Sequence, residues 1–194
     1  MDELTAPLYS GRMKVALFAL LLTLPAQAGL AAPPPRPDPI FITPSGEAIH
    51  PSTQTPDAFA VWFDRLDTRR EGRIDRAEFR ADAEQFFHRI DLNGDGVIDG
   101  FEIAAYEKSV AADLDIAGQG FATGTSENTI SLLSDPEPVS SADLQLNAHI
   151  TLAEWLTVAD RRFDLLDAKH HGYLTREALD DMLPKWFRER ERKR

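Results

Sequence analysis

The residues of this sequence best suited to chemistry form one run of oxygen-bearing side chains at positions 91–102, Asp-Leu-Asn-Gly-Asp-Gly-Val-Ile-Asp-Gly-Phe-Glu. Four carboxylates fall within this run, and no lysine or arginine interrupts them. Calcium is a hard cation that takes about six to eight oxygen ligands. The spacing predicts a calcium site built from side-chain oxygens and one backbone carbonyl. The side chains are those of Asp91, Asn93, Asp95, Asp99 and Glu102, and the carbonyl is that of Val97.

The other positions of this run support the prediction. Gly96 allows the positive φ of a sharp turn, and Ile98 supplies an apolar anchor for a short strand contact. The run is similar to an EF-hand calcium loop, and this resemblance implies that Glu102 closes the coordination sphere with both oxygens and that Asp99 acts through a water molecule. A plain surface turn rich in Asp and Gly would not explain Ile98, the glutamate four residues later, or the helical patterns on both sides.

This run resembles the twelve-residue calcium loop of the EF-hand superfamily. More narrowly, the chain is similar to small secreted bacterial proteins with several calmodulin-like hands, some of them degenerate, over about residues 57–180. The resemblance implies an all-α fold of helix-loop-helix repeats, with four loops, one of them complete, and very short loop strands. It also implies Ca²⁺ as the ion that is bound. We name residues 91–102 loop 2.

Loop 1, residues 67–78, keeps the framework of a calcium loop but has Arg69 at its third position. Four arginines match its four carboxylates, so its net charge is zero, against −4 in loop 2. An arginine donates no oxygen and repels a cation. Whether loop 1 binds calcium stays open at the level of sequence.

Two weaker copies follow in the second half of the chain. Loop 3, residues 143–154, keeps oxygens at positions one, three, five, nine and twelve, but it has two carboxylates and Ala148 where the turn favours glycine. Loop 4, residues 167–178, has Lys169 at position three and Ala178 at the closing position, so we expect no calcium there. In each half the loops start 24 residues apart, which favours an internal duplication over chance similarity. Position eight is apolar in every loop: Ile74, Ile98, Ile150 and Leu174.

Helices must position these loops. Between loops 1 and 2 only residues 79–90 remain, with one apolar helical face and no glycine or proline. One shared helix of about 18 Å is therefore predicted, with the two loops at its opposite ends. Ile74 and Ile98 then cannot pair with each other, so each loop must pair with a loop of the other half. A break near residues 82–85 would restore pairing within each half.

Other elements follow from caps and composition. Thr55 and Pro56 predict the start of an incoming helix, and an exit helix is expected from Ile103 to about Leu114. Residues 40–43 lie in a proline-rich arm and form either a short strand with a turn or part of a flexible tether. The expected organisation is a signal peptide (1–28), the arm (29–56), EF hands 1 and 2 (57–114), a linker loop (115–142), degenerate EF hands 3 and 4 (143–187) and a basic tail (188–194).

The N-terminus has the pattern of an export signal. Two basic residues precede the apolar run 15–24, which is too short to span a membrane, since a spanning helix needs about 20 residues. Ala26 and Ala28 then offer the small residues of a cleavage site, and we expect cleavage after Ala28 and a periplasmic or secreted protein. Met1 and Met13 both remain possible starts. The alternative is an apolar N-terminal helix that is retained in the fold.

Composition excludes several classes of function. The chain has 194 residues, 43% of them hydrophobic, enough for one sizeable core or two small ones. With no cysteine, it forms no disulfide, no thiolate zinc site and no cysteine nucleophile. A formal charge of −11 argues against general nucleic-acid binding and fits a protein that binds cations.

Other candidate features are weaker. His170 and His171 suggest a transition-metal site only in isolation, because no further ligand lies at helical spacing from them. The basic tail is expected to be a solvated helix end, with contact to an anionic surface or to the chain's own acidic loops as the alternative. We find no nucleophile motif and no phosphate-binding glycine loop, and therefore expect no enzyme. Four aromatic residues are expected in the core or capping it: Trp155, Phe163, Trp186 and Phe187.

The sequence thus predicts an exported, non-enzymatic calcium-binding protein with one strong site in loop 2 and a structural or buffering role. The alternative is an interaction module or calcium sensor, in which the degenerate hands form a groove for a protein partner. Neither hypothesis includes nucleic acid or a membrane span.

Overall fold

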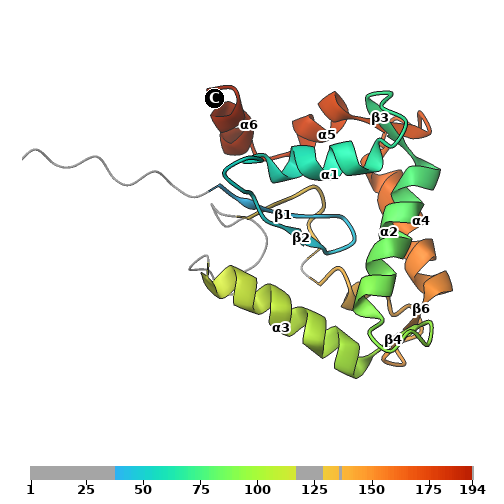
Figure 1. Ribbon diagram of the computed structural model, residues 1–194. Helices are drawn as coiled ribbons and strands as arrows, with labels where there is room; N and C mark the ends of the chain where they lie inside the picture. Colours follow the sequence, from blue (N-terminus) through green and yellow to red (C-terminus); the bar gives the residue numbers. More distant parts are fainter. Residues whose placement is uncertain (1–37, 117–128, 136, 194) are drawn as a thin grey trace, which may run out of the picture. The chain divides into compact units, whose positions relative to one another are not determined.

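The computed structural model describes residues 38–116, 129–135 and 137–193 (Figure 1). The expected signal peptide therefore lies outside the described residues. None of the described helices is long and apolar enough to cross a membrane. In chain order the elements are β1 (Ile40–Ile42), β2 (Ala48–Ile49), α1 (Ala58–Leu66), β3 (Arg73–Asp75), α2 (Arg76–Ile90), β4 (Val97–Asp99), α3 (Gly100–Ile116), β5 (Thr129–Ser131), η1 (Ser140–Ala142), β6 (His149–Thr151), α4 (Leu152–Leu166), β7 (Tyr173–Thr175), α5 (Arg176–Met182) and α6 (Lys185–Glu191).

Helices α2 and α4 form an antiparallel pair that carries a loop at each of its four ends (Figure 1). The Phe79 and Phe163 rings meet edge to face at 5.6 Å near one end of the pair. Closer to the other end, the Trp155 indole Nε1 donates to the Ala83 carbonyl at 2.7 Å. These contacts fix the axial register and the rotation of the two helices relative to each other. They thereby fix the positions of the loops.

The predicted shared helix is confirmed, because α2 runs without a break from loop 1 to loop 2. At its N-terminus Asp75 and Glu78 form a reciprocal capping box, and Asp91 caps its C-terminus. It contains no glycine or proline, and its apolar side chains remain on one buried face. The break considered near residues 82–85 does not occur.

The predicted pairing between the two halves is also confirmed. Strand β3 pairs antiparallel with β7, with Ile74 opposite Leu174, and β4 pairs antiparallel with β6, with Ile98 opposite Ile150. All four of these side chains are buried. Loop 1 therefore lies beside loop 4 at one end of the α2–α4 pair, and loop 2 lies beside loop 3 at the other.

The expectation of an all-α fold is not confirmed. Helices dominate the described chain, but strand β1 has an antiparallel neighbour, β2, and a parallel neighbour, β5. Residues 40–42 thus form the short strand rather than a tether, with Phe41 fully buried. The range expected to be a linker loop, 115–142, contains β5 and the 3₁₀ turn η1. Short sequences such as Thr-Ile-Ser at 129–131 carry no periodicity from which a strand can be predicted.

The structure corrects one local prediction and narrows another. Helix α1 begins at Ala58 and its N-cap is Asp57, whose carboxylate accepts the Ala60 N–H at 3.0 Å. Thr55 bonds to Ser52 instead, and an ionised aspartate suits the positive end of the helix better than a threonine hydroxyl. Trp186, which was expected in the core or capping it, lies outside the core: 37% of it is exposed beside the buried Phe187.

The core gathers residues from both halves around α2 and α4. Its largest members that are almost completely inaccessible to solvent belong to β1, α1, α2, α4 and α6: Phe41, Phe59, Trp62, Phe87, Trp155, Phe163 and Phe187. Trp155 and Phe163 are thus buried as expected. Aromatic contacts link β1 to α1 and α1 to α2, so β1 packs on the same core as the helices that carry the loops.

Candidate metal centre

Loop 2 connects the end of α2 to the start of α3, and the secondary structure positions its oxygen donors. Asp91 is the C-cap of α2, while Val97 and Asp99 lie in β4 and Glu102 in the first turn of α3. The β4–β6 ladder holds the loop against loop 3. Four of the six candidate ligands therefore stand on helices or strands at the two ends of the loop.

Asp91 organises the first half of the loop. Its carboxylate accepts the Gly94 N–H at 2.8 Å through Oδ1 and the Gly96 N–H at 2.9 Å through Oδ2. Gly96 has φ of +85°, and an added Cβ would meet nothing within 4 Å, so glycine is needed here for its backbone conformation and not for lack of space. Asp91 itself is only 6% exposed.

Asn93 and Asp95 form the outer edge of the loop. Asn93 Oδ1 accepts the Asp95 N–H at 2.8 Å, and Asp95 Oδ1 accepts the Val97 N–H at 2.9 Å. The Asn93 amide also donates to Asp95 Oδ2 at 3.1 Å. Each of these side-chain oxygens is held by the backbone two residues on, in the manner of an Asx turn.

Glu102 closes the loop by reaching back across it. Its Oε1 accepts the N–H groups of Leu92 and Asn93 at 2.8 and 3.2 Å, and its Oε2 accepts that of Asp99 at 2.9 Å. Asp99 in turn accepts the Glu102 N–H at 3.0 Å, which makes a reciprocal cap for α3. A carboxylate offers about four lone-pair sites, so these three donors leave Glu102 little free capacity.

The donor set of loop 2 fits calcium chemically. It contains oxygen donors only, and none of its four carboxylates forms an ion pair within the described residues. Asp91 and Glu102 are both buried, where an uncompensated negative charge is costly. The described residues do not, however, bring three His, Cys, Asp or Glu side chains together as a metal-binding cluster. A cation would have to share Glu102 with its backbone donors.

Loop 1 contains its own cation. The Arg69 guanidinium pairs with Asp75, approaches Glu78 at 3.4 Å and lies 3.9 Å from Glu71. These are the carboxylates at loop positions nine, twelve and five. Glu78 also accepts the Thr68 hydroxyl at 2.8 Å. The charges that would attract calcium are therefore already engaged by an arginine of the same loop.

The titration behaviour of loop 1 agrees with this arrangement. Three carboxylates, led by Asp75, raise the pKa of Arg69. The Glu78 backbone N–H lowers the pKa of Asp75 against the opposing effect of burial, and Arg69 lowers it further. From the sequence, Arg69 at position three is expected to hinder calcium binding. That its guanidinium pairs with the carboxylates in place of the ion was not predicted. Three acidic residues at the ligand positions of the same loop are the signal that could have shown this.

Loop 3 has the same backbone design with fewer charges. Asp143 accepts the N–H groups of Asn147 and Ala148 at 3.1 and 2.8 Å. Ala148 adopts φ of +61° and so takes over the conformation of the expected glycine. Glu154 is buried and bonds through Oε2 to Thr151, while its Oε1 accepts no hydrogen bond within the described chain. Loop 3 thus keeps one unused carboxylate oxygen.

Loop 4 is closed without a terminal glutamate. Asp167 accepts the His171 and Gly172 N–H groups at 2.9 and 2.7 Å, and the Thr175 hydroxyl caps α5. His170 and His171 are both exposed, and the His171 ring stacks on Tyr173. Neither histidine belongs to a group of three or more possible metal ligands among the described residues.

The family comparison concerns the same part of the chain. A family model described as EF hand matches residues 83–105. Residues 83–105 thus match the EF-hand family. The match covers the second half of α2, all of loop 2 and the start of α3, so the similarity to EF hands, and the calcium binding that it suggests in general, concern this part of the chain. No curated protein matches the chain at a significant level.

Proposed function

We propose that the protein binds one calcium ion in loop 2 and has no catalytic activity. The ligands are the six residues predicted from the sequence: Asp91, Asn93, Asp95, Val97, Asp99 and Glu102. The observation that carries the proposal is the contrast between loops 1 and 2. Both loops have acidic side chains at ligand positions, but in loop 1 Arg69 pairs with three of them, whereas the described residues provide no cationic partner in loop 2.

The same geometry supports a weak site with a structural or buffering role. Calcium must share or replace backbone hydrogen bonds at Glu102, and each bond that is lost reduces the net gain on binding. Extracellular calcium modules bind with Kd values of about 10⁻⁴–10⁻³ M. At high calcium concentrations, a site of this strength stabilises the protein or buffers the ion. It does not respond to small changes in calcium concentration.

Isothermal titration calorimetry on residues 29–194, the chain expected after removal of the signal peptide, tests the site. The wild type is expected to bind one calcium, and Glu102→Gln to bind it about tenfold or more weakly, because this change removes a charged bidentate ligand. Glu78→Gln is the matched control: it makes the same change at position twelve of loop 1 and should leave affinity and stoichiometry unchanged. Equal calcium affinity in the wild type and Glu102→Gln would show that the site is elsewhere.

We further propose that the protein is exported to the periplasm or beyond the cell. Support comes from the N-terminal sequence alone: the basic residues Arg12 and Lys14 precede the apolar run 15–24, and the small residues Ala26 and Ala28 follow it. Mass spectrometry of the protein recovered from each cell fraction tests this. An exported chain that begins at Gly29 is expected, and an intact N-terminus recovered from the cytoplasm would refute the proposal.

A calcium sensor is the second candidate, and one observation favours it. A cavity of about 280 Å³ lies between α2 and α3 and is lined by Phe86, Ile90 and Tyr106 together with Glu102 of the site. Movement of Glu102 toward a cation would change this cavity. A sensor would bind more of an apolar dye when calcium is added, whereas a structural or buffering site leaves dye binding unchanged.

A further inference from the structure

The turn between strands β1 and β2 is buried, although connecting segments normally run over the protein surface. Four consecutive residues of this turn, 43–46, are buried. They include two polar residues, Thr43 and Ser45, which are 2% and 4% exposed. Other parts of the chain therefore cover the turn. We name residues 43–47 the arm turn.

Helix α3 covers one side of the arm turn. The Tyr106 hydroxyl donates to the Gly46 carbonyl at 2.6 Å. A Cβ added to Gly46 would lie 2.9 Å from the Tyr106 oxygen and 2.9 Å from Pro138 Cγ, so a larger residue would push the turn away from α3. The Tyr106 ring also meets the Phe86 ring of α2 edge to face at 5.9 Å. Tyr106 thus joins α3 to both the arm turn and α2.

Glu47 connects the other side of the arm turn to α2 and α1. Its carboxylate pairs with Arg89 of α2 at 2.8 Å and with Arg65 of α1 at 2.5 Å. Arg65 in turn pairs with Asp82 of α2 at 2.8 Å. The Glu47 side chain is only 19% exposed, so water screens these pairs less than it screens a surface ion pair. The arm turn is therefore attached to α2 and to α3 at the same time.

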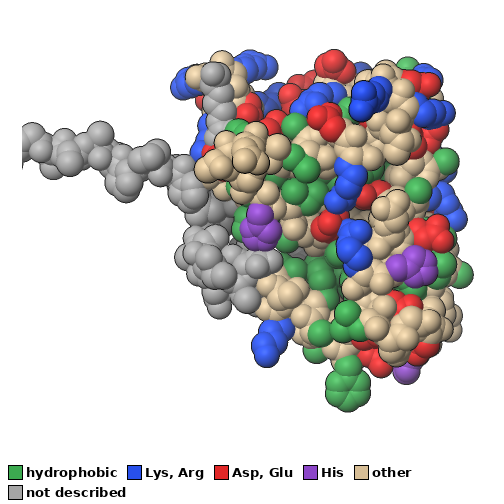
Figure 2. All heavy atoms as spheres, in the orientation of Figure 1, with side chains coloured by type: hydrophobic (Ala, Val, Ile, Leu, Met, Phe, Trp, Pro, Cys, Tyr) green, Lys and Arg blue, Asp and Glu red, His purple; other side chains and the backbone are tan. Residues whose placement is uncertain are grey.

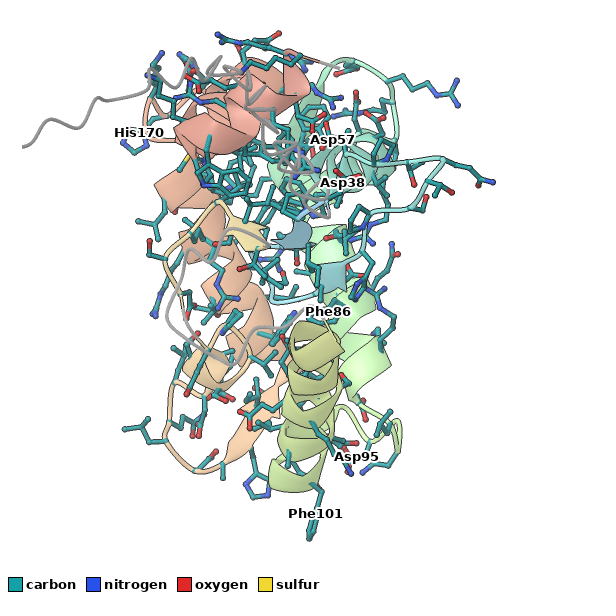
Figure 3. All side chains as sticks on the ribbon, turned by 90° about the vertical axis from the view of Figure 1, so that its left-hand side faces the viewer. Asp38, Asp57, Phe86, Asp95, Phe101 and His170 are labelled. Carbon is teal, nitrogen blue, oxygen red and sulfur yellow. The ribbon has the colours of Figure 1, made fainter. Side chains whose placement is uncertain are left out.

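The figures show where the arm turn lies between these helices. In Figure 1 the turn after β1 points toward α2, with α3 below it. Figure 2 shows Lys or Arg side chains beside Asp or Glu side chains on this face, near the place where the turn reaches α2. In Figure 3 Phe86 lies above the upper end of α3, and Asp95 of loop 2 lies near its lower end. The arm turn thus bridges the two helices that loop 2 connects.

These contacts lie close to the candidate calcium ligands. Arg89 precedes Asp91 by two residues, and Tyr106 follows Glu102 by four residues, about one turn further along α3. A cation that takes Glu102 from its backbone donors would shift the start of α3. EF-hand sensors respond to calcium by changing the angle between their two helices. A turn that is bonded to both helices opposes such a change.

We propose that the arm turn is a brace that fixes the angle between α2 and α3, so that calcium occupies loop 2 without opening the cavity between these helices. The inference rests on the proposed calcium site and adds a control of its response. The brace also weakens calcium binding, because Glu102 is held back from the ion. By linkage, release of the brace tightens calcium binding by the same factor by which calcium favours release.

The distance between two spin labels tests the brace on residues 29–194. The chain has no cysteine, so Gln85→Cys on α2 and Lys108→Cys on α3 provide two unique labelling positions, both of them exposed. Without calcium, this labelled chain should give one narrow distribution of distances. Adding Tyr106→Phe and Glu47→Gln should at least double the width of the distribution, because both attachments of the arm turn are weakened.

Tyr173→Phe combined with Glu71→Gln is the matched control. It makes the same two chemical changes in loops 1 and 4, and Glu71, like Glu47, lies within ion-pair distance of two arginines. The control should leave the width of the distribution unchanged. Circular dichroism verifies that every variant is folded. Tyr106→Phe and Glu47→Gln made singly should give intermediate widths, so the comparison also holds if the double variant does not fold.

Calcium titrations test the effect of the brace on the site. In calorimetry, Tyr106→Phe combined with Glu47→Gln should bind calcium at least fivefold more tightly than the wild type. Added calcium should raise the binding of an apolar dye at least twofold in this double variant and leave it unchanged in the wild type.

Three outcomes would overturn the inference. The first is an equal width of the calcium-free distribution in the wild type and the double variant. The second is a longer distance in the wild type when calcium is added, since the helices would then open despite the arm turn. The third is equal calcium affinity and equal dye binding in the wild type and the double variant. If calorimetry detects no calcium binding at all, the proposed function fails, while the calcium-free distances still decide whether the arm turn fixes the two helices.

Discussion

The aspartate at position one has the same structural role in all four loops. Asp67, Asp91, Asp143 and Asp167 each cap the preceding helix or turn and each accept two backbone N–H groups of their own loop. Positions nine and twelve similarly form helix caps in loops 1, 2 and 3. The residues of the calcium pattern therefore also build the loop, which explains why the pattern persists in loops that lack other ligands.

Asp167→Ala should destabilise the protein by about 2–3 kcal/mol although loop 4 is not expected to bind calcium, because two hydrogen bonds to a charged group are lost. Urea denaturation without calcium measures this free energy of unfolding. Lys169→Ala, an exposed change in the same loop, should alter it by no more than about 0.5 kcal/mol. A loss confined to calcium-containing buffer would contradict the structural role.

The stability contributed by these carboxylates should depend on pH. Burial opposes ionisation of Asp167, but the N–H groups of His171 and Gly172 outweigh it and lower the pKa of Asp167 below the usual 3.8. A group whose pKa is lower in the folded state stabilises the protein above its unfolded pKa and loses this effect as pH falls through the folded value. The difference in unfolding free energy between the wild type and Asp167→Ala should thus shrink below about pH 3.8. If this difference in unfolding free energy stays constant down to pH 2.5, the ionised Asp167 carboxylate does not contribute the stability.

Arg69→Asp should give loop 1 a calcium site. The change removes the guanidinium that pairs with Asp75 and Glu78, and it supplies an oxygen at position three. Calorimetry is expected to show one additional bound calcium. Arg70→Asp alters the charge equally at the neighbouring position without adding a ligand, and it should leave the stoichiometry unchanged. An unchanged stoichiometry in Arg69→Asp would mean that the remaining arginines suffice to exclude the ion.

At the scale of elements, the contact between α2 and α4 determines where the loops lie. The Trp155 indole donates to the Ala83 carbonyl at 2.7 Å inside the core. Trp155→Phe retains an aromatic ring but loses this bond, so we expect a loss of about 1–2 kcal/mol in unfolding free energy by urea denaturation. Trp186→Phe, at a residue that is 37% exposed, should have an effect close to zero. Equal effects of the two changes would show that the buried bond is unimportant.

The sequence allowed the α-helical framework to be predicted better than the strands. A stretch of uninterrupted helical periodicity between loops of fixed length determines α2, and the pairing of Ile74 and Ile98 with the other half follows from its geometry. The β1–β5 pairing could not be predicted, because it joins Phe41 to Ile130 through long-range packing with no local signal. Loop 2 was identified from side-chain chemistry, whereas the contacts of Arg69 depend on the rotamer that folding selects.

At the scale of the whole molecule, every described sheet joins the first half of the chain to the second. Strands β1, β3 and β4 pair with β5, β7 and β6 respectively. Neither half should therefore fold alone. Residues 38–116 and 129–194, produced separately, are expected to show little ordered structure by circular dichroism and to gain it on mixing. A stable, monomeric fragment 38–116 with cooperative unfolding would contradict this.

The two loop ladders also differ in how much chain each must close. Ile98 and Ile150 are 52 residues apart, whereas Ile74 and Leu174 are 100 residues apart, which costs about 0.6 kcal/mol more in loop-closure entropy. Once the ladder of loops 2 and 3 has formed, α2 and α4 carry loops 1 and 4 together with little further loss of entropy. Refolding should thus proceed from the end with loops 2 and 3 toward the end with loops 1 and 4. A cation in loop 2 would then accelerate folding as well as slow unfolding.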